Sequence, residues 1–233
     1  MSISTNHNGN DRMTVLEARQ RDIWRIFKVM SEFVDGFDLM SRAAPAVSIF
    51  GSARMKPGSK YYELTRQVAC ELAKTGYAIV SGGGGGLMEA ANRGAREGGG
   101  QSIGLNIALE FEQKANDYVD PDKLMTFHHF FVRKVMFVKY AQGFVVMPGG
   151  YGTMDEFSEA ITLIQTHKTV SFPVVLMGRN YWKKLLEWMQ GTALEEGCIS
   201  KTDLDIFHVC DEPDEVVQII KEFGIRHGFV TNF

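Results

Sequence analysis

Short apolar runs alternate with longer segments of helical periodicity along most of the chain. Seven runs have the length of buried strands: AVSIF (46–50), YAIVS (77–81), SIGLN (102–106), LMTF (124–127), GFVVM (143–147), PVVLM (173–177) and IFHVC (206–210). Apolar residues recur at helical spacing in the segments 61–74, 87–97, 130–141, 153–166, 181–190 and 213–223. Continuous apolar strands separated by helices indicate a parallel sheet covered on both faces. We therefore expect a Rossmann-like, doubly wound α/β fold with a mostly parallel sheet of about seven strands.

Length and composition fit one globular domain. The chain has 233 residues, 45% of them hydrophobic, and single α/β domains commonly reach about 200–250 residues. A net charge of −3 without basic runs argues against nucleic-acid or membrane partners. The polar first dozen residues lack the apolar region of a signal peptide. We predict disorder over residues 1–12, a single domain over 13–233 and a cytoplasmic location.

The metal-binding residue types are sparse and poorly spaced. The three cysteines, Cys70, Cys198 and Cys210, form no CxxC pair, which favours reduced thiols in the core over a disulfide framework or a zinc site. His128 and His129 are adjacent, which is not the spacing of helical metal ligands. No metal site is expected.

A further helical segment, residues 14–40, precedes the first strand. Its apolar residues fall near a 3.6-residue period: Leu16, Ile23, Phe27, Met30, Val34 and Phe37. The helix either packs on its own sheet or makes an oligomer contact. We treat residues 13–42 as an N-terminal helical extension.

Two glycine clusters follow predicted strands. SGGGGGLMEAANRGA (81–95) follows the second strand and PGGYGT (148–153) the fifth. Ligands of such sheets bind beyond the C-terminal strand ends, and a helix that starts there presents N–H groups suited to phosphate. Neither cluster supplies the Lys of a Walker loop, and the first lacks the third glycine of the dinucleotide fingerprint. Tight strand-to-helix turns are the alternative explanation.

Arg133 and Lys134 lie near the start of FFVRKVMFVKY, a helical segment that is apolar on almost every side. Such a helix is expected to be buried, and buried cations require an anion. The anion is either a protein carboxylate or a ligand phosphate. Glu156 also has two explanations: it completes a capping box with Thr153, or it acts on a ligand from the first turn of its helix.

These residues together resemble the LONELY GUY (LOG) family. PGGYGTMDE (148–156) fits the family signature PGGxGTxxE, and GGGGGLMEAANRGA (82–95) resembles its second glycine loop. Arg133-Lys134 match the family's Arg-Lys helix, and GSAR (51–54) resembles its turn after the first strand. The matches keep the family's order and cover roughly residues 49–168. The long N-terminal helix resembles the longer bacterial branch.

The resemblance implies a phosphoribohydrolase, which cleaves adenosine-type nucleoside 5′-monophosphates to a free base and ribose 5-phosphate. AMP and cytokinin riboside 5′-monophosphates are both candidate substrates. Members were also labelled lysine decarboxylases, but nothing in this sequence supports the pyridoxal phosphate site which that reaction needs. No cofactor is expected. The alternative is a non-catalytic nucleotide- or molybdenum-cofactor-binding protein on the same scaffold, which would not need Glu156.

The resemblance also assigns residues. Arg133 and Glu156 are the expected catalytic pair, and Arg133 is expected to help hold Glu156 ionised. The expected substrate-binding residues are Ser52, Arg54, Gly83, Gly84, Met88, Lys134, Gly149, Gly150, Gly152 and Thr153. Because family members are at least dimers, we expect a homodimer here, which the N-terminal helix would extend to a tetramer or hexamer.

Overall fold

The computed structural model describes residues 15–109, 114–229 and 232 of the chain. The disorder predicted for residues 1–12 lies outside this part. The strands are β1 (Ala46–Phe50), β2 (Ala78–Ser81), β3 (Ser102–Ile107), β4 (Leu124–Phe127), β5 (Ala141–Val146), β6 (Val174–Met177) and β7 (Phe207–Cys210). The α-helices are α1 (Val15–Ser41), α2 (Lys60–Lys74), α3 (Leu87–Glu97), α4 (Phe130–Lys139), α5 (Tyr151–Gln165), α6 (Arg179–Trp188) and α7 (Pro213–His227). Short helical turns cover Pro121–Lys123, Met189–Ala193 and Lys201–Asp205.

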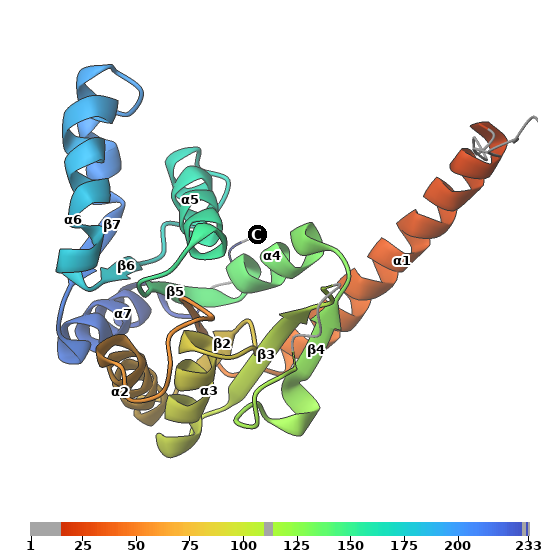
Figure 1. The fold of residues 1–233 in the computed structure, drawn as a ribbon, viewed down its shortest axis with the longest axis horizontal. Coiled ribbons are helices and arrows are strands. Elements are labelled where there is room, and N and C mark those ends of the chain that lie inside the picture. Colours follow the sequence, from red (N-terminus) through yellow and green to blue (C-terminus); the bar gives the residue numbers. More distant parts are fainter. Residues whose placement is uncertain (1–14, 110–113, 230–231, 233) are drawn as a thin grey trace, which may run out of the picture.

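Within the described residues, the seven strands form one sheet in the order β4-β3-β2-β1-β5-β6-β7. Every neighbouring pair is parallel, so the predicted doubly wound α/β fold is confirmed. The chain builds outward from β1 to β4, then returns to place β5 on the other side of β1 (Figure 1). The strand order thus reverses between β1 and β5, where ligands of such sheets bind.

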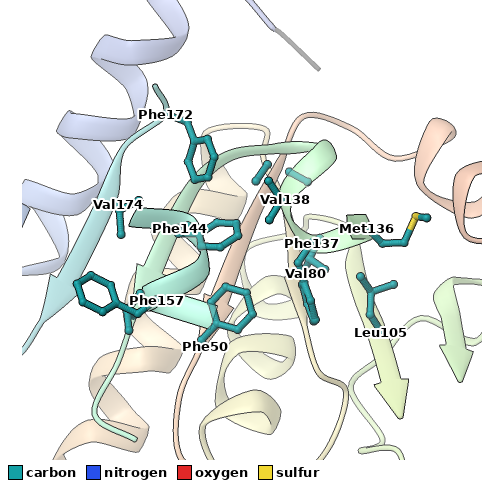
Figure 2. Packing of buried hydrophobic residues seen from close by; sticks show 14 of the residues in the cluster. Phe50, Val80, Leu105, Met136, Phe137, Val138, Phe144, Phe157, Phe172 and Val174 are labelled. Carbon is teal, nitrogen blue, oxygen red and sulfur yellow. The ribbon is translucent and has the colours of Figure 1, made fainter. Parts of the chain in front are cut away.

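Alternate strand residues point to opposite faces of the sheet, and both faces are covered. Val47, Ile49 and Val145 pack under α2, α3 and α7. Phe50 and Phe144 lie on the other face, among side chains of α4 and α5. Figure 2 shows the centre of this second layer, where the rings of Phe50 and Phe144 lie 4.9 Å apart. This two-sided burial explains the continuous apolar runs in the sequence.

Helix α1 packs only in part on its own domain. Met40 is buried near its end, and Glu32 is buried where its carboxylate accepts hydrogen bonds from the backbone N–H groups of His128 and His129, just before α4. The N-terminal part of the helix extends away from the sheet as a rod (Figure 1). Large apolar side chains stay exposed along it: Ile23, Trp24, Ile26, Phe27, Met30 and Val34. Intramolecular packing therefore accounts for one end of α1, and the exposed face remains without a covering element among the described residues.

No helix in the described ranges combines the length and apolar character of a membrane span. All three cysteines are free; Cys210 is buried, Cys70 is half-buried and Cys198 is exposed, so the expected core position is wrong for Cys198.

Candidate functional site

A cavity of about 840 Å³ opens at the C-terminal ends of β1 and β5. Its walls come from the loops after β1, β2 and β5 and from the first turns of α4, α5 and α6. Nine of the predicted site residues line it: Ser52, Arg54, Met88, Arg133, Gly149, Gly150, Gly152, Thr153 and Glu156. Gly83, Gly84 and Lys134 are not part of the lining. The cavity therefore lies at the switch point, where the fold brings together segments far apart in the sequence.

Ser52 joins the two glycine-rich loops. Its N–H donates to the Pro148 carbonyl at 3.0 Å, and its carbonyl accepts from the Leu87 N–H at 2.9 Å. Its hydroxyl accepts from the Arg54 N–H at 3.2 Å, which shapes the turn that carries the exposed Arg54 to the cavity. The loop after β1 therefore sets the spacing between the other two.

Helix α5 begins at Tyr151, two residues before the predicted start. Gly150 is the N-cap in an extended conformation, and no side chain caps the helix. The capping-box explanation is therefore wrong, because Thr153 already lies inside the first turn. Glu156 falls in the second turn rather than the first. Its position needs an explanation other than helix capping.

The glycines of the β5–α5 loop differ in their surroundings. A Cβ on Gly149 would lie 2.1 Å from the Thr153 hydroxyl oxygen, so only glycine fits there. A Cβ on Gly150 or Gly152 would meet no heavy atom within 4 Å, although both residues line the cavity. This open backbone at the start of a 15-residue helix suits a phosphate, because helix N-termini present unpaired N–H groups and a positive dipole end.

Glu156 is a buried acid without a full set of partners. Its side chain is 6% exposed, and its Oε2 atom has no hydrogen-bond partner among the described residues. Burial raises its pKa to about 7, while the charges of Lys134 and Arg133 act in the lowering direction. The expected effect of Arg133 thus has the predicted sign, but desolvation outweighs it. A carboxyl group with this pKa exchanges a proton near neutral pH, as general acid–base catalysis requires.

Arg133 reaches the cavity across Gly82. A Cβ on Gly82 would lie 2.6 Å from the guanidinium and 2.6 Å from the Met88 sulfur, so Gly82 makes room for both. The Nε–H of Arg133 donates to the Leu105 carbonyl at 2.7 Å, and the guanidinium carbon lies 5.1 Å from the ring centre of Phe137. These contacts hold a cation at the cavity wall beside the buried carboxylate.

Lys134 points to protein acids instead. Its Nζ lies 3.0 Å from Asp155 and 2.8 Å from Glu159. Each of the two expected partners, a protein carboxylate and a ligand, therefore fits one cation of α4. Lys134 pairs with protein carboxylates, and Arg133 lines the cavity. The direct role of Lys134 in substrate binding has no support in this geometry. The expected all-round burial of α4 is also wrong, because Phe130 and Phe131 are each 53% exposed in its first turn.

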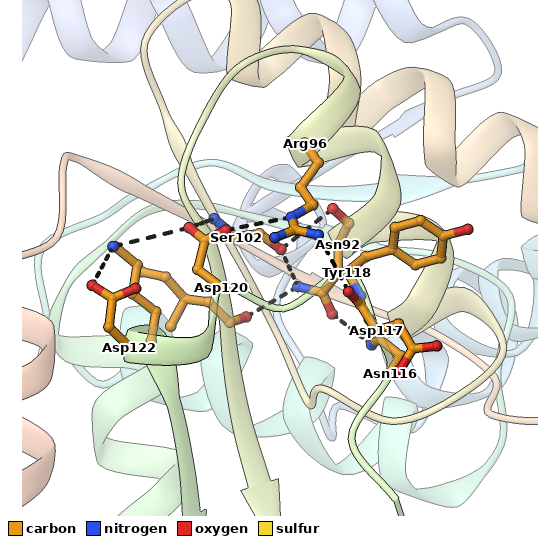
Figure 3. A network of polar contacts seen from close by, with 10 residues as sticks. Asn92, Arg96, Ser102, Asn116, Asp117, Tyr118, Asp120 and Asp122 are labelled. Carbon is orange, nitrogen blue, oxygen red and sulfur yellow. Dashed lines mark hydrogen bonds and ion pairs between the residues drawn. The ribbon is translucent and has the colours of Figure 1, made fainter.

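Gly83 and Gly84 are held by hydrogen bonds on the side away from the cavity lining, and Figure 3 shows the neighbouring polar network around Asn92 and Asn116. The side-chain amide of Asn116 donates to the Gly84 carbonyl, its backbone N–H donates to the Gly83 carbonyl, and the Ser81 hydroxyl accepts from the Gly83 N–H. Asn92, which is fully buried, accepts hydrogen bonds from both Asn116 and Ser81. These two glycines therefore serve the scaffold of the loop.

His128 and His129 lie at the α1–α4 contact. The Nδ1 atoms lie 3.1 Å and 3.2 Å from the Glu32 carboxylate. Within the part of the chain that the structure describes, no cluster of three or more His, Cys, Asp and Glu side chains is arranged to hold a metal ion.

Gly82 and Tyr181 also line the cavity, among other residues that the sequence did not single out. Gly82 is not among the expected binding residues, because the five glycines of the run look alike in sequence and only its contacts distinguish it. Tyr181 lies beyond every matched motif, and it reaches the cavity only because β6 pairs with β5.

Comparisons with known proteins identify the family of the chain. Residues 88–220 match a family model described as possible lysine decarboxylase. The cytokinin riboside 5′-monophosphate phosphoribohydrolase LOG1 of Arabidopsis thaliana is 30% identical over 177 residues, which cover 74% of this chain and 80% of that protein. The enzyme of the same name from Mycobacterium marinum is 29% identical, over 67% of this chain and 83% of that protein.

Among solved structures, the molybdenum cofactor binding protein of Rippkaea orientalis aligns with a TM-score of 0.59. It is 19% identical and covers 78% of this chain and 98% of that one, so this likeness supports the fold alone. The sequence matches go further, since they extend over most of the chain. The chain therefore belongs to the LONELY GUY family of N-glycosidic hydrolases, whose family model is described as possible lysine decarboxylase.

Proposed function

We propose that the protein is a phosphoribohydrolase that cleaves adenosine-type nucleoside 5′-monophosphates to a free base and ribose 5-phosphate. The observation that carries this proposal is the buried carboxylate of Glu156, with an unpaired oxygen, five residues into a helix whose N-terminus is open to the cavity. A protein that only held an anion would gain nothing from an acid there, because the acid would repel the ligand. A hydrolase needs both the open N-terminus of α5, to bind the phosphate, and the carboxylate, to act on the sugar.

The phosphate of the substrate binds the N–H groups of Gly150, Gly152 and Thr153 at the start of α5. The ribose then lies over the next turn, with its anomeric carbon near Glu156. Met88 and Ile107, which also line the cavity, offer apolar surface to the base. Arg133 contacts the ribose or phosphate from the opposite wall.

In the reaction, the bond from C1′ to the base nitrogen breaks and a bond from the water oxygen to C1′ forms. One water proton ends on the base, and the hydroxyl stays on the sugar. The ionised Glu156 stabilises positive charge at C1′ and takes the proton from the attacking water, as carboxylates do in glycoside hydrolysis. Because its pKa is about 7, we expect kcat/KM to rise as the pH rises through neutrality.

The test is to incubate the purified protein with AMP and with N6-isopentenyl-AMP and to follow the free base by chromatography. Wild type should release base, and Glu156→Gln should lower kcat by about 10²–10⁴-fold. Glu159→Gln is the matched control, because it removes a nearby carboxylate that pairs with Lys134 outside the cavity lining. It should retain most of the activity. The ratio of the two substrates defines the preferred base.

Two other results would contradict the proposal. If AMP raises the melting temperature without release of base, the protein is a binding protein, which was the alternative reading of the sequence. If Glu156→Gln and Glu159→Gln lower the rate equally, Glu156 has no special part in the chemistry.

We also propose that the active form is a homodimer or a larger assembly in the cytoplasm. Phe130 and Tyr151 line the cavity yet are 53% and 97% exposed, which suits cover by a second copy. The exposed face of α1 offers a separate contact that would extend a dimer to a tetramer or hexamer. Light scattering should give at least a dimer at micromolar concentration, and Phe27→Asp should reduce a larger assembly. A wild-type monomer would contradict this proposal.

A further inference from the structure

The phosphate loop is held by a side chain from a distant segment. Tyr181 belongs to the first turn of α6, and its hydroxyl donates a hydrogen bond of 2.6 Å to the Gly149 carbonyl. The same side chain lines the cavity. Tyr181 thus connects α6 to the Pro148–Thr153 segment. It has no role in the reaction proposed for Glu156 and Arg133.

The structure around Tyr181 fixes where its hydroxyl lies. Gly178 turns the chain with a φ of 94°, and a Cβ there would lie 3.1 Å from the Tyr61 ring and 3.5 Å from Pro148. Trp182, which is 2% exposed, anchors the same helical turn through its Nε1–H to the Met177 carbonyl at 3.0 Å. The Trp182 ring also packs edge-on against Tyr181 at 4.9 Å. The phenol is therefore presented by a rigid turn.

The bonded carbonyl belongs to the peptide between two glycines, Gly149 and Gly150. A peptide group flanked by residues without Cβ atoms meets little steric resistance to rotation as a unit. Because the group is planar and trans, a fixed Gly149 carbonyl directs the Gly150 N–H the opposite way. A rotated peptide would present a carbonyl oxygen where the N–H now lies, and that oxygen would repel phosphate.

We propose that Tyr181 is a positioning residue that holds the Gly149–Gly150 peptide in the orientation which binds the substrate phosphate. This rests on the proposed function only in assigning the phosphate to this loop. The phosphate is remote from the bond that breaks, and we expect the single hydrogen bond at Gly149 to contribute equally before and during the reaction. Removal of the phenol hydroxyl should therefore raise KM and leave kcat unchanged.

The experiment compares Tyr181→Phe with Tyr61→Phe. Both lose one hydroxyl, and the two rings are neighbours with centres 6.4 Å apart, but the bond to Gly149 comes from Tyr181. Binding is measured by calorimetry in the Glu156→Gln background, which prevents turnover, with AMP, ribose 5-phosphate and adenine as probes. Tyr181→Phe should weaken AMP and ribose 5-phosphate by about three- to tenfold, as expected for one neutral hydrogen bond. Adenine binding should not change.

A merely structural role predicts a different pattern. Equal weakening of AMP and adenine, or no change with any probe, would overturn the proposal, as would a loss in Tyr61→Phe of the same size. If ribose 5-phosphate fails to bind the Glu156→Gln parent, the loop is not a phosphate site and the proposal also fails. If wild type binds AMP without releasing base, the hydrolase proposal fails, while the Tyr181 result still stands or falls on the binding data.

Discussion

The two glycine-rich loops beside the cavity look alike in sequence and differ in what surrounds their backbone. In the loop after β2, the carbonyls of Gly83 and Gly84 and the N–H of Gly83 are all taken by Asn116 and Ser81. In the loop after β5, Gly150 and Gly152 face open space at a helix start. A run of glycines therefore does not identify a ligand loop. We propose that the ligand loop is the one whose glycines the protein leaves uncovered.

The largest effect on stability should come from the network behind the first loop. Asn92→Ala should lower the free energy of unfolding by about 3 kcal/mol, because it removes several side-chain hydrogen bonds from a fully buried part of the network. The Asn92 side chain accepts from the Ser81 hydroxyl and the Asn116 amide, and it donates to the Ser102 hydroxyl and the Ile103 carbonyl. Urea unfolding measures the loss. Asn116→Ala should cost less, because water reaches this half-buried side chain. A loss below about 1 kcal/mol for Asn92→Ala would remove the distinction between the loops.

The helix after the second loop should show the opposite relation, in which Glu156, the proposed catalytic residue, reduces stability. The pKa of Glu156 is raised from 4.5 to about 7 in the folded chain. The unfolded chain therefore binds fewer protons between these two pH values, and stability falls as the pH rises through them. Above pH 7 the folded protein carries the full cost of the buried charge. Glu156→Gln should stabilise the protein by roughly 2–3 kcal/mol at pH 8 and hardly at pH 4. Melting temperatures that shift equally at both pH values would contradict this.

Gly86, the last glycine of the first loop, allows a test of the close contact between this loop and the loop after β1. Gly86 has a φ of 67°, and a Cβ there would lie 2.4 Å from the Ser52 carbonyl oxygen. Gly86→Ala should cost roughly 2 kcal/mol through backbone strain and displacement of the loop after β1. Gly99→Ala is the matched control, because its φ of 75° is similar and its surroundings are open. Equal losses in thermal unfolding would mean that the contact with Ser52 contributes nothing.

The smallest effect on stability should accompany a clear effect on binding. Gly152→Ala places a methyl group in open space inside α5, so stability should stay the same or rise by up to about 1 kcal/mol. The methyl group would occupy the approach of the phosphate and weaken AMP binding by at least about tenfold, or 1.4 kcal/mol. Gly191→Ala, also in open surroundings but outside the cavity lining, should leave binding unchanged. Unaltered AMP affinity in Gly152→Ala would place the phosphate elsewhere.

The sequence predicted the elements well, because two-sided burial produces unbroken apolar strands. It missed the first two residues of β5, where the polar Gln142 interrupts the pattern. Within the site, it identified the residues of the β5–α5 loop but placed the start of α5 at Thr153, since Gly150 provides no capping side chain. It also favoured Gly83 and Gly84 over Gly82, because the direction that a glycine faces depends on tertiary contacts. The side-chain pairing of Lys134 and the reach of Tyr181 depend on such contacts too.

The central place of β1 also has a consequence for the order in which the chain is made. About 90 residues separate the end of β1 from the start of β5, its neighbour at the switch point. Protein synthesis adds roughly 5–20 residues per second. One edge of β1, a strand that is apolar on both faces, therefore stays unpaired for about 5–20 seconds until β5 has been made. An unpaired apolar edge is a template for pairing with other chains. Newly made chains should therefore aggregate most readily when synthesis pauses before Ala141, and the cavity cannot exist before β5 and the start of α5 have been made.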